Sequence, residues 1–413
     1  MNRYTVLIDG VGIGVNIVFH GKNVLNINSQ CSFLFDVTNI QIIETRFGGW
    51  TLFNHNLIII LTDVDDKKSY FCRMKKYCQY ILALALVVAT VQVCTAQVCG
   101  CTDPMALNYN GKAMVNDGTC KYAHSVIKAE VLGKLDPLIQ GTSSLLYWNN
   151  NYWTYNDHND NCLYRIDSTN AATAETLCMN KIRNFDTEEI SQDDQYLYFG
   201  DIGNNSGKRK DLQILRIRKD AIRNKVYKVD TIRFSYEDQT DFTARLNATD
   251  FDCEAFVVTK DSIYLFTKQW VSRKTTIYSI PKTPGTHIAY RRETNNVKGL
   301  ITGVTYIPEY QLVVLCGYDY DKRNILSALH PFIVLLYDYK DGFFFSGNKR
   351  RLDFGSGVKA QIEGIATSNG LDFYLTCEHF TTTKMGITFD FPAQLYRLDL
   401  RKYLLPYIKA EGK

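Results

Sequence analysis

Three glutamates stand at matching positions of a repeated strand pattern, where they could bind a cation or transfer protons. They are Glu188, Glu254 and Glu363, and two further units of the repeat have Ser144 and Thr302 at the corresponding position. Carboxylates that converge in a narrow space repel one another, so either their pKa values rise or a cation lies among them. The repeat therefore predicts a functional or metal-bearing centre.

Polar residues also end the second strand of each unit and should crowd around the same point. Oxygen ligands favour Ca²⁺ over zinc, so the sequence predicts a calcium site built from Glu188, Glu254, Glu363, Asp201 and Glu378. As an alternative, each repeated glutamate caps backbone N–H groups of a neighbouring unit, or pairs with Lys268 or Arg209.

The same residues could support hydrolysis. Glu254 or Glu363 would act as metal ligand or base, with His158 or His379 as proton carrier. No Ser-His-Asp arrangement, phosphate-binding loop or dinucleotide fingerprint stands out, so no organic cofactor is expected. The sequence does not decide whether the protein is an enzyme.

A strand repeat from about residue 143 must position these side chains. Its third strands share an apolar-aromatic pattern, and they start at residues 163, 214, 277, 334 and 395. Such spacing, with three or four strands per unit, predicts an all-β fold and a β-propeller of five blades. Six blades remain possible if 343–345 and 351–354 belong to a split blade. The last unit lacks an outer strand, which residues 125–132 could supply.

The start of the chain indicates export. Residues 74–96 combine a basic start, a 13-residue apolar run and small residues before a cut, as in a secretory signal peptide. We interpret Met74 as the true start and residues 1–73 as spurious upstream translation or a disordered segment. The rival interpretation is a real N-terminal domain, in which 56–62 could be a strand. No lipobox is convincing, so periplasm, cell surface and medium all remain open as destinations.

Composition limits the partners. Residues 97–413 carry 39 basic and 37 acidic residues, so no nucleic-acid surface is expected. The apolar run of the signal is too short for a membrane span, and we expect a monomer. The run Lys208-Arg209-Lys210 could attract an anionic ligand, although such a run can also be a solvated loop tip. A glycan, a peptide or a small anionic ligand are all compatible partners.

A small cysteine-bounded segment, 97–123, precedes the propeller, which is expected over 124–413. Its motif runs from Cys101-Thr-Asp-Pro through Asn108-Tyr to Asp117-Gly-Thr-Cys120-Lys-Tyr. It closely resembles a short repeat of secreted Gram-negative proteins, and the resemblance implies a Cys101–Cys120 disulfide and a structural or adhesive role. Asp103, Asn108 and Asp117 could bind calcium or could simply stabilise turns.

Residues 125–401 in turn resemble a family of secreted bacterial propellers of largely unknown function. The resemblance rests on Asp186 and Glu188, on the Gly-Asp-Ile-Gly-Asn-Asn run at 200–205, on Asp252 and Glu254, and on Glu363. That family is similar to phytase-like, gluconolactonase-like and paraoxonase-like propellers, which implies a calcium ion in the central channel. No phytase-like cluster of basic residues is present.

Cysteine positions add two expectations. Cys162 and Cys178 flank a predicted turn of one hairpin, so an exported protein could join them. Cys316 and Cys377 occupy matching repeat positions and should be buried thiols. Together these observations predict an exported propeller that binds a ligand or surface partner with Ca²⁺ in its channel and without catalysis. The alternative is a calcium-dependent secreted hydrolase of phosphoesters or lactones.

Overall fold

The computed structural model describes residues 98–158, 160–222, 224, 227–319, 329–384 and 386–411, together with five short strands before residue 62. The chain divides into two compact units, Met1–Thr95 and Ala96–Lys413. The strands of the first unit form one antiparallel sheet in the order β1-β2-β5-β4-β3: Arg3–Val6, Val15–Val18, Leu57–Leu61, Trp50–Asn54 and Gln41–Glu44. The strand expected at 56–62 is thus present as β5, whereas the expected signal peptide at 74–96 lies outside the described residues.

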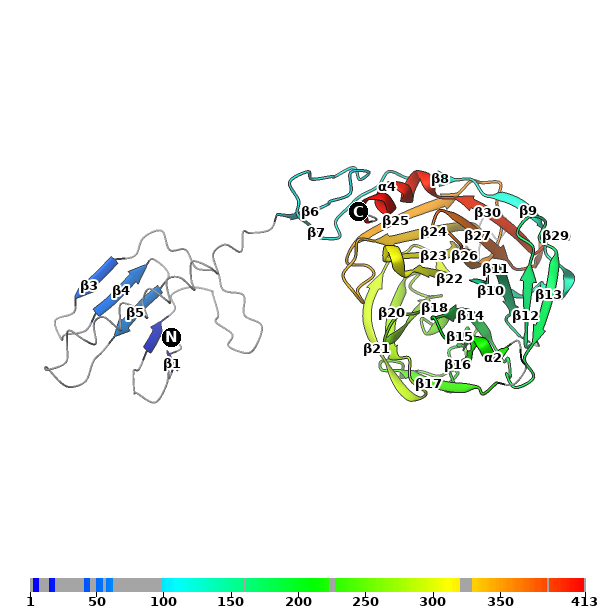
Figure 1. Ribbon diagram of the computed structural model, residues 1–413, viewed down its shortest axis with the longest axis horizontal. Helices are drawn as coiled ribbons and strands as arrows, with labels where there is room; N and C mark the ends of the chain where they lie inside the picture. Colours follow the sequence, from blue (N-terminus) through cyan, green and yellow to red (C-terminus); the bar gives the residue numbers. More distant parts are fainter. Residues whose placement is uncertain are drawn as a thin grey trace. The chain divides into compact units, whose positions relative to one another are not determined.

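The second unit is a β-propeller of four-stranded antiparallel blades (Figure 1). Blade 1 consists of β10 Thr142–Trp148, β11 Asn151–Asn156, β12 Cys162–Ile166 and β13 Thr173–Cys178. Blade 2 consists of β14 Thr187–Gln192, β15 Tyr196–Asp201, β16 Gln213–Arg218 and β17 Asp230–Tyr236. Blade 3 consists of β18 Asp252–Val258, β19 Ser262–Lys268, β20 Thr275–Pro281 and β21 Gly285–Asn295.

The last two blades follow the same plan. Blade 4 consists of β22 Leu300–Ile307, β23 Leu312–Asp319, β24 His330–Tyr337 and β25 Asn348–Phe354. Blade 5 consists of β26 Ile362–Thr367, β27 Asp372–Cys377, β30 Gln394–Asp399 and β9 Glu130–Lys134. All five predicted third strands are therefore confirmed, as β12, β16, β20, β24 and β30.

The number of blades is five. The innermost strands contact one another in a closed ring, in the order β10, β14, β18, β22, β26 and back to β10. The possible sixth blade is wrong, because residues 351–354 belong to β25 at the outside of blade 4. Phe344 and Phe345 instead pack into the apolar core between blades 3 and 4.

An N-terminal strand closes the ring, but not at the expected residues. β9 pairs antiparallel with β30, with Lys134 opposite Gln394. Residues 126–127, which were expected to belong to the same strand, form β8 (Val126–Ile127) and pair in parallel with β25 of blade 4. The chain therefore passes along the outside of blade 4 before it completes blade 5.

The apolar core is divided among the spaces between neighbouring blades. On β15, Leu197 and Phe199 face the core shared with blade 1, whereas Tyr198 between them faces the core shared with blade 3. Side chains alternate between the two faces of a strand. A strand buried on both faces thus needs apolar residues in a continuous run, as at 332–337 in β24.

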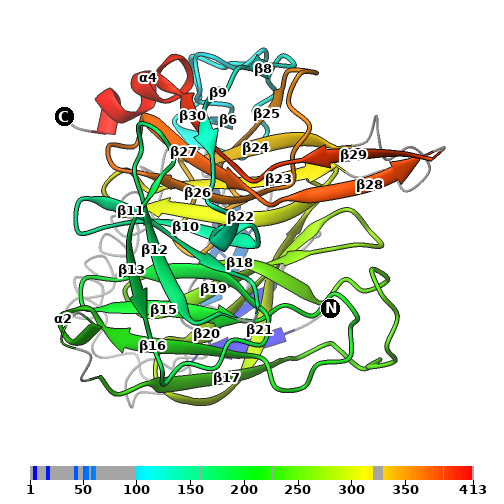
Figure 2. The same cartoon turned by 90° about the vertical axis from the view of Figure 1, so that its right-hand side faces the viewer.

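A further strand pairing, one hairpin and four helical segments complete the described part of the second unit. The outer strands β17 and β21 pair in parallel and join blades 2 and 3 into one eight-stranded sheet. Figure 2 shows that a two-stranded hairpin extends away from blade 5, formed by β28 Phe380–Lys384 and β29 Ile387–Phe391. The helical segments are η1 Pro137–Ile139, α2 Lys219–Ile222, η2 Pro308–Tyr310 and α4 Arg401–Glu411. Within the described residues, no helix has the length and apolar character needed to cross a membrane.

The cysteine-bounded segment packs onto the outside of blade 4. The Cys101–Cys120 disulfide is present, and two short strands pair beside it, β6 Cys99–Gly100 and β7 Val115–Asn116. Asp103 accepts hydrogen bonds from the hydroxyls of Tyr122 at 2.7 Å and of Tyr337 on β24 at 2.6 Å. The segment is therefore attached to the propeller through residues of its own motif.

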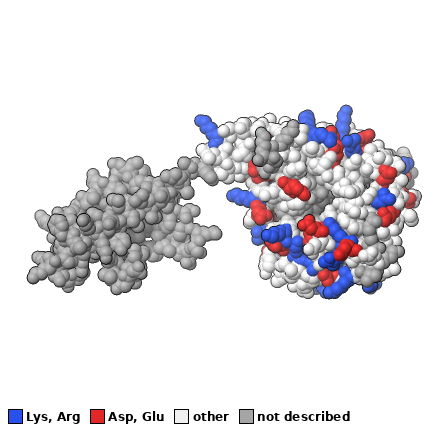
Figure 3. All heavy atoms as spheres, in the orientation of Figure 1, with Lys and Arg blue, Asp and Glu red and all other residues white. Residues whose placement is uncertain are grey.

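The expectations for the other cysteines are confirmed. A disulfide joins Cys162 to Cys178 across the pair of strands β12 and β13. Cys316 and Cys377 are buried thiols. Charge is mixed over the face of the second unit shown in Figure 3, where acidic and basic side chains alternate over short distances. No extended basic surface is visible on that face.

Candidate functional site

Each innermost strand carries a β-bulge at the same register. The bulge leaves one residue without a cross-strand partner, and these residues are Ser143, Glu188, Glu254, Thr302 and Glu363. A bulge re-aims the side chain of the extra residue. The three predicted glutamates are thus structurally equivalent, and Ser143, rather than the expected Ser144, is their counterpart in blade 1.

The two bulge residues with hydroxyl groups bind the neighbouring blade. Ser143 Oγ donates a hydrogen bond of 2.7 Å to the carbonyl oxygen of Thr187 on β14. Thr302 Oγ1 donates in the same way to the carbonyl oxygen of Ile362 on β26. In these blades the bulge therefore joins innermost strands, whereas the three glutamates present carboxyl groups.

One buried lysine lies among the glutamates. Lys268 ends β19, and its Nζ is 2.7 Å from Oε2 of Glu254, with both side chains about one-twentieth exposed. The ammonium group also lies 4.9 Å from the ring centre of Trp270 and 5.5 Å from that of Tyr318. The expected alternative, a glutamate paired with Lys268, is therefore confirmed for Glu254.

The charges of the glutamates act on one another and on Lys268. Burial raises the pKa of Glu188 well above its usual value, and the nearby Glu254 and Asp186 raise it further. Burial likewise raises the pKa of Glu363, where Glu378 and Glu254 add to the rise and Lys268 opposes it. Burial opposes the charged form of Lys268, but the surrounding acidic groups outweigh it and hold its pKa well above the usual range.

Glu378, after the end of β27, belongs to the same group. Burial raises its pKa to about 7, together with the charge of Asp157, and Lys268 and His158 oppose the rise. We call Glu188, Glu254, Glu363, Glu378 and Lys268 the channel cluster. The innermost strands and the ends of second strands thus bring four of the five expected metal ligands together.

The fifth expected ligand and one histidine lie elsewhere. Asp201 is buried and forms an ion pair with Arg209 at 2.9 Å, although the sequence suggests Arg209 as a partner of a repeated glutamate. His158 Nδ1 lies 2.6 Å from Asp157, close enough to Glu378 to influence its pKa. His379 Nε2 lies 2.6 Å from Asp390 on the hairpin strand β29, so its imidazole is engaged there.

The channel cluster does not have the geometry of a calcium site. Among the residues that the structure describes, no three Asp, Glu, His or Cys side chains are arranged so that they could hold a metal ion. Glu254 and Asp201 already have basic partners, and the ammonium of Lys268 supplies positive charge among the carboxyl groups. Calcium at this position remains a prediction that requires the side chains to rearrange.

The oxygen atoms of the cysteine-bounded segment are also engaged. Asp103 Oδ1 accepts from the backbone N–H of Met105, and its Oδ2 accepts from two tyrosines. Asn108 Oδ1 accepts from the N–H of Lys121, and Asp117 Oδ1 accepts from Thr119. As they stand, these three side chains stabilise turns and the contact with blade 4.

One further acidic residue was missed from the sequence. Glu189 follows the bulge on β14, is only 1% exposed, and accepts a 3.0 Å hydrogen bond from the backbone N–H of Val304 on β22. Blades 2 and 4 are not neighbours, so this side chain reaches across the centre of the ring. Burial raises its pKa well above the usual value. In the sequence, only the presence of two consecutive glutamates in an innermost strand could have indicated a role for Glu189.

The loop after β15 packs against the acidic residues at the start of β14 and β18. Gly203 lies so close to the carboxyl groups of Asp186 and Glu188 that a Cβ there would clash with both. The next residue, Asn204, donates its backbone N–H to Asp252 at 2.6 Å and accepts from the N–H of Arg209 at 2.9 Å. The Gly-Asp-Ile-Gly-Asn-Asn run thus positions the neighbouring carboxyl groups, and its own side chains do not form a group of metal ligands.

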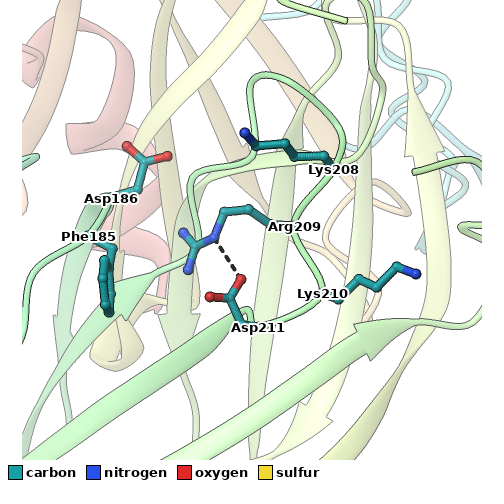
Figure 4. Close-up of a pocket in the computed structure, with 6 residues that line it drawn as sticks. All are labelled: Phe185, Asp186, Lys208, Arg209, Lys210 and Asp211. Carbon is teal, nitrogen blue, oxygen red and sulfur yellow. Dashed lines mark hydrogen bonds and ion pairs between the residues drawn. The ribbon is translucent and has the colours of Figure 1, made fainter. Parts of the chain in front are cut away.

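An open hollow of about 770 Å³ adjoins this loop (Figure 4). It is lined by Phe185, Asp186, Lys208, Arg209, Lys210 and Asp211. Burial and the charge of Asp252 raise the pKa of Asp186 to about 6, against the effect of Arg209. Asp186 therefore links the hollow electrostatically to Glu188 of the channel cluster.

The chain shows only low similarity to known proteins, in sequence and in structure. No protein-family model matches the chain, and no curated protein matches it either. Among solved structures, the chain is similar to a glutaminyl cyclase from Myxococcus xanthus, with 11% identity and a TM-score of 0.40, over 67% of this chain and 99% of that one. It is also similar to the computationally designed Ika8 protein, with 10% identity and a TM-score of 0.26, over 65% of this chain and 99% of that one. Likeness this low transfers no activity or site.

Proposed function

We propose that the protein is an exported binding protein that takes a positively charged group of its ligand into the channel cluster, without converting the ligand. The observation that carries the proposal is the excess of four carboxyl groups over one ammonium group at the centre of the ring. The two disulfides support export, because such bonds persist in oxidising compartments.

Attraction between the positive charge of the ligand and the carboxylates would drive binding, and the raised pKa values couple binding to the release of protons. Burial disfavours the charged form of these carboxyl groups and raises the pKa values of Glu188 and Glu363. A cation that enters the cluster allows them to ionise. An organic ammonium group suits the site, because Trp270 and Tyr318 already contact the ammonium of Lys268 and can contribute cation–π attraction.

Titration calorimetry with butylammonium chloride tests this proposal. Binding should release protons, so the measured enthalpy should differ between buffers of different ionisation enthalpy. The affinity should rise between about pH 5 and pH 8, as Asp186 and Glu378 lose protons from pKa values of about 6 and about 7. Glu363→Gln should weaken binding by about tenfold, which corresponds to ~1.4 kcal/mol.

Glu309→Gln serves as the matched control, because Glu309 is exposed in the short helical segment η2, away from the cluster. It should bind butylammonium as the unmodified protein does. If neither butylammonium nor Ca²⁺ binds at any pH from 5 to 8, the proposed function is wrong.

A second candidate function is hydrolysis of phosphoesters or lactones. The observation in its favour is the pKa of Glu378 at about 7, beside the charge of His158, because a general acid or base works best near the ambient pH. Glu378→Gln should then abolish turnover of a panel of such esters, and turnover that survives in this variant would exclude Glu378 as the base.

A further inference from the structure

A second hollow lies next to the one in Figure 4 and has a different character. Its volume is about 200 Å³, and it is lined by Leu212, Phe234, Phe242, Ser235, Gln239, Arg209 and Lys210. Three of these residues form apolar walls. The two hollows share Arg209 and Lys210, and we call the second hollow, which adjoins the loop at 206–211, the groove.

Arg209 already has acidic partners. Its guanidinium lies 2.9 Å from Asp201 and 3.1 Å from Asp211, and it donates a 2.9 Å hydrogen bond to the carbonyl oxygen of Gly203. Two carboxylates therefore balance its charge. Arg209 therefore stabilises the loop, and we expect the neighbouring residues to bind a ligand.

The two lysines beside Arg209 are differently placed. Both are exposed, and within the described part of the chain neither forms an ion pair with an acidic side chain. Lys208 extends along the side of the hollow on which Asp186 lies, whereas Lys210 extends to the opposite side (Figure 4). The ammonium of Lys210 lies 4.6 Å from the ring centre of Phe242, at the apolar hollow.

We propose that this groove binds a small anion that carries an apolar group, with the anionic group at Lys210 and the apolar group between Leu212, Phe234 and Phe242. Charge complementarity selects the anion, because the ammonium group of Lys210 forms no ion pair with an acidic side chain among the described residues. The apolar walls select the remainder of the ligand, since burial of a phenyl or short alkyl group there removes apolar surface from water. The volume of the apolar hollow suits a single ring.

This site is separate from the channel cluster. Its residues come from the loop after β15, from the outer strand β17 and from the segment that follows β17, whereas the cluster is formed by innermost strands and by the ends of second strands. Neither Lys208 nor Lys210 belongs to the cluster. Loss of the groove should therefore leave binding of butylammonium unchanged, and the two proposals can fail independently.

Calorimetry with three matched probes tests the groove in the full-length protein. 3-Phenylpropionate carries both groups, propionate lacks the ring, and 3-phenylpropan-1-ol lacks the charge. We expect 3-phenylpropionate to bind at least tenfold more tightly than either control, and at least fivefold more weakly when NaCl is raised from 50 to 500 mM. Equal affinity for the three probes would overturn the proposal.

Two variants locate the bound probe. Lys210→Gln should weaken binding of 3-phenylpropionate at least fivefold, because it removes the charge and keeps the apolar stem of the side chain. Ser235→Trp should do the same by filling the apolar hollow. Lys402→Gln is the matched control, since Lys402 also lies over a tyrosine ring, 5.6 Å from Tyr403, but outside the groove. Binding that survives both groove variants, in proteins with unchanged melting temperatures, would refute the assignment.

Discussion

At the scale of single residues, the bulge position explains how one strand pattern serves two purposes. Where the residue is Ser143 or Thr302, its hydroxyl ties two innermost strands together. Where it is a glutamate, the same position presents a carboxyl group to the centre of the ring. The identity of one residue per blade therefore decides whether the bulge contributes to stability or to chemistry.

The Glu254–Lys268 pair should show strong energetic coupling. Removal of one partner leaves a buried charge without compensation, which costs about 3–5 kcal/mol. Glu254→Gln and Lys268→Met should each lower the free energy of unfolding by an amount of this order, whereas the double variant should lose less than the sum. A double-mutant cycle in urea measures the coupling, and strictly additive losses would mean that the two groups act independently.

Glu189 should make stability depend on pH. Its pKa is raised in the folded state, so the folded protein holds a proton that the unfolded chain releases above its own pKa of about 4.3. The free energy of unfolding should therefore fall as pH rises from about 4.3 towards the folded-state pKa. Glu189→Gln, which cannot ionise, should flatten this dependence.

The alanine variant separates charge from hydrogen bonding at the same position. Glu189→Ala leaves the N–H of Val304 without its partner, and we expect a loss of about 1–3 kcal/mol at every pH. Urea titrations at pH 5, 6, 7 and 8 would measure both effects. An unchanged pH dependence in Glu189→Gln would contradict the role of this carboxyl group.

At the scale of elements, the strands were predictable and their side-chain partners were not. The third strands and the three matching glutamates followed from periodicity, because two-sided burial demands apolar runs that repeat with each blade. Lys268 entered only as an alternative partner, since nothing in the order of residues fixes which second-strand end faces which glutamate. Glu189 was missed because its partner, Val304, lies two blades away.

The loop after β15 offers a test at this scale. Gly203→Ala should push the carboxyl groups of Asp186 and Glu188 aside, because a Cβ there would overlap both. Overpacking of this kind costs about 1–3 kcal/mol, and butylammonium binding should weaken with it. Gly357→Ala is the matched control, because a Cβ at Gly357 meets no atom within 4 Å. Equal melting temperatures and affinities for the two variants would contradict the role given to the loop.

At the scale of the whole molecule, a thermal melt decides whether calcium belongs to the protein. A metal that binds only the folded state must raise the melting temperature. If the predicted site forms, addition of Ca²⁺ after EDTA should raise it by several degrees, and Glu363→Gln with Glu378→Gln should remove the shift. No shift in the unmodified protein would leave Lys268 as the only cation of the cluster.

Blade 5 is assembled from both ends of the propeller sequence, with Lys134 paired to Gln394. During synthesis, β9 therefore emerges long before β30, and its pairing edge has no partner for most of that time. Unpaired strand edges promote association with other chains. A chain that stalls before residue 394 would thus expose an adhesive edge, which makes completion of the last strand the step that protects the protein from aggregation.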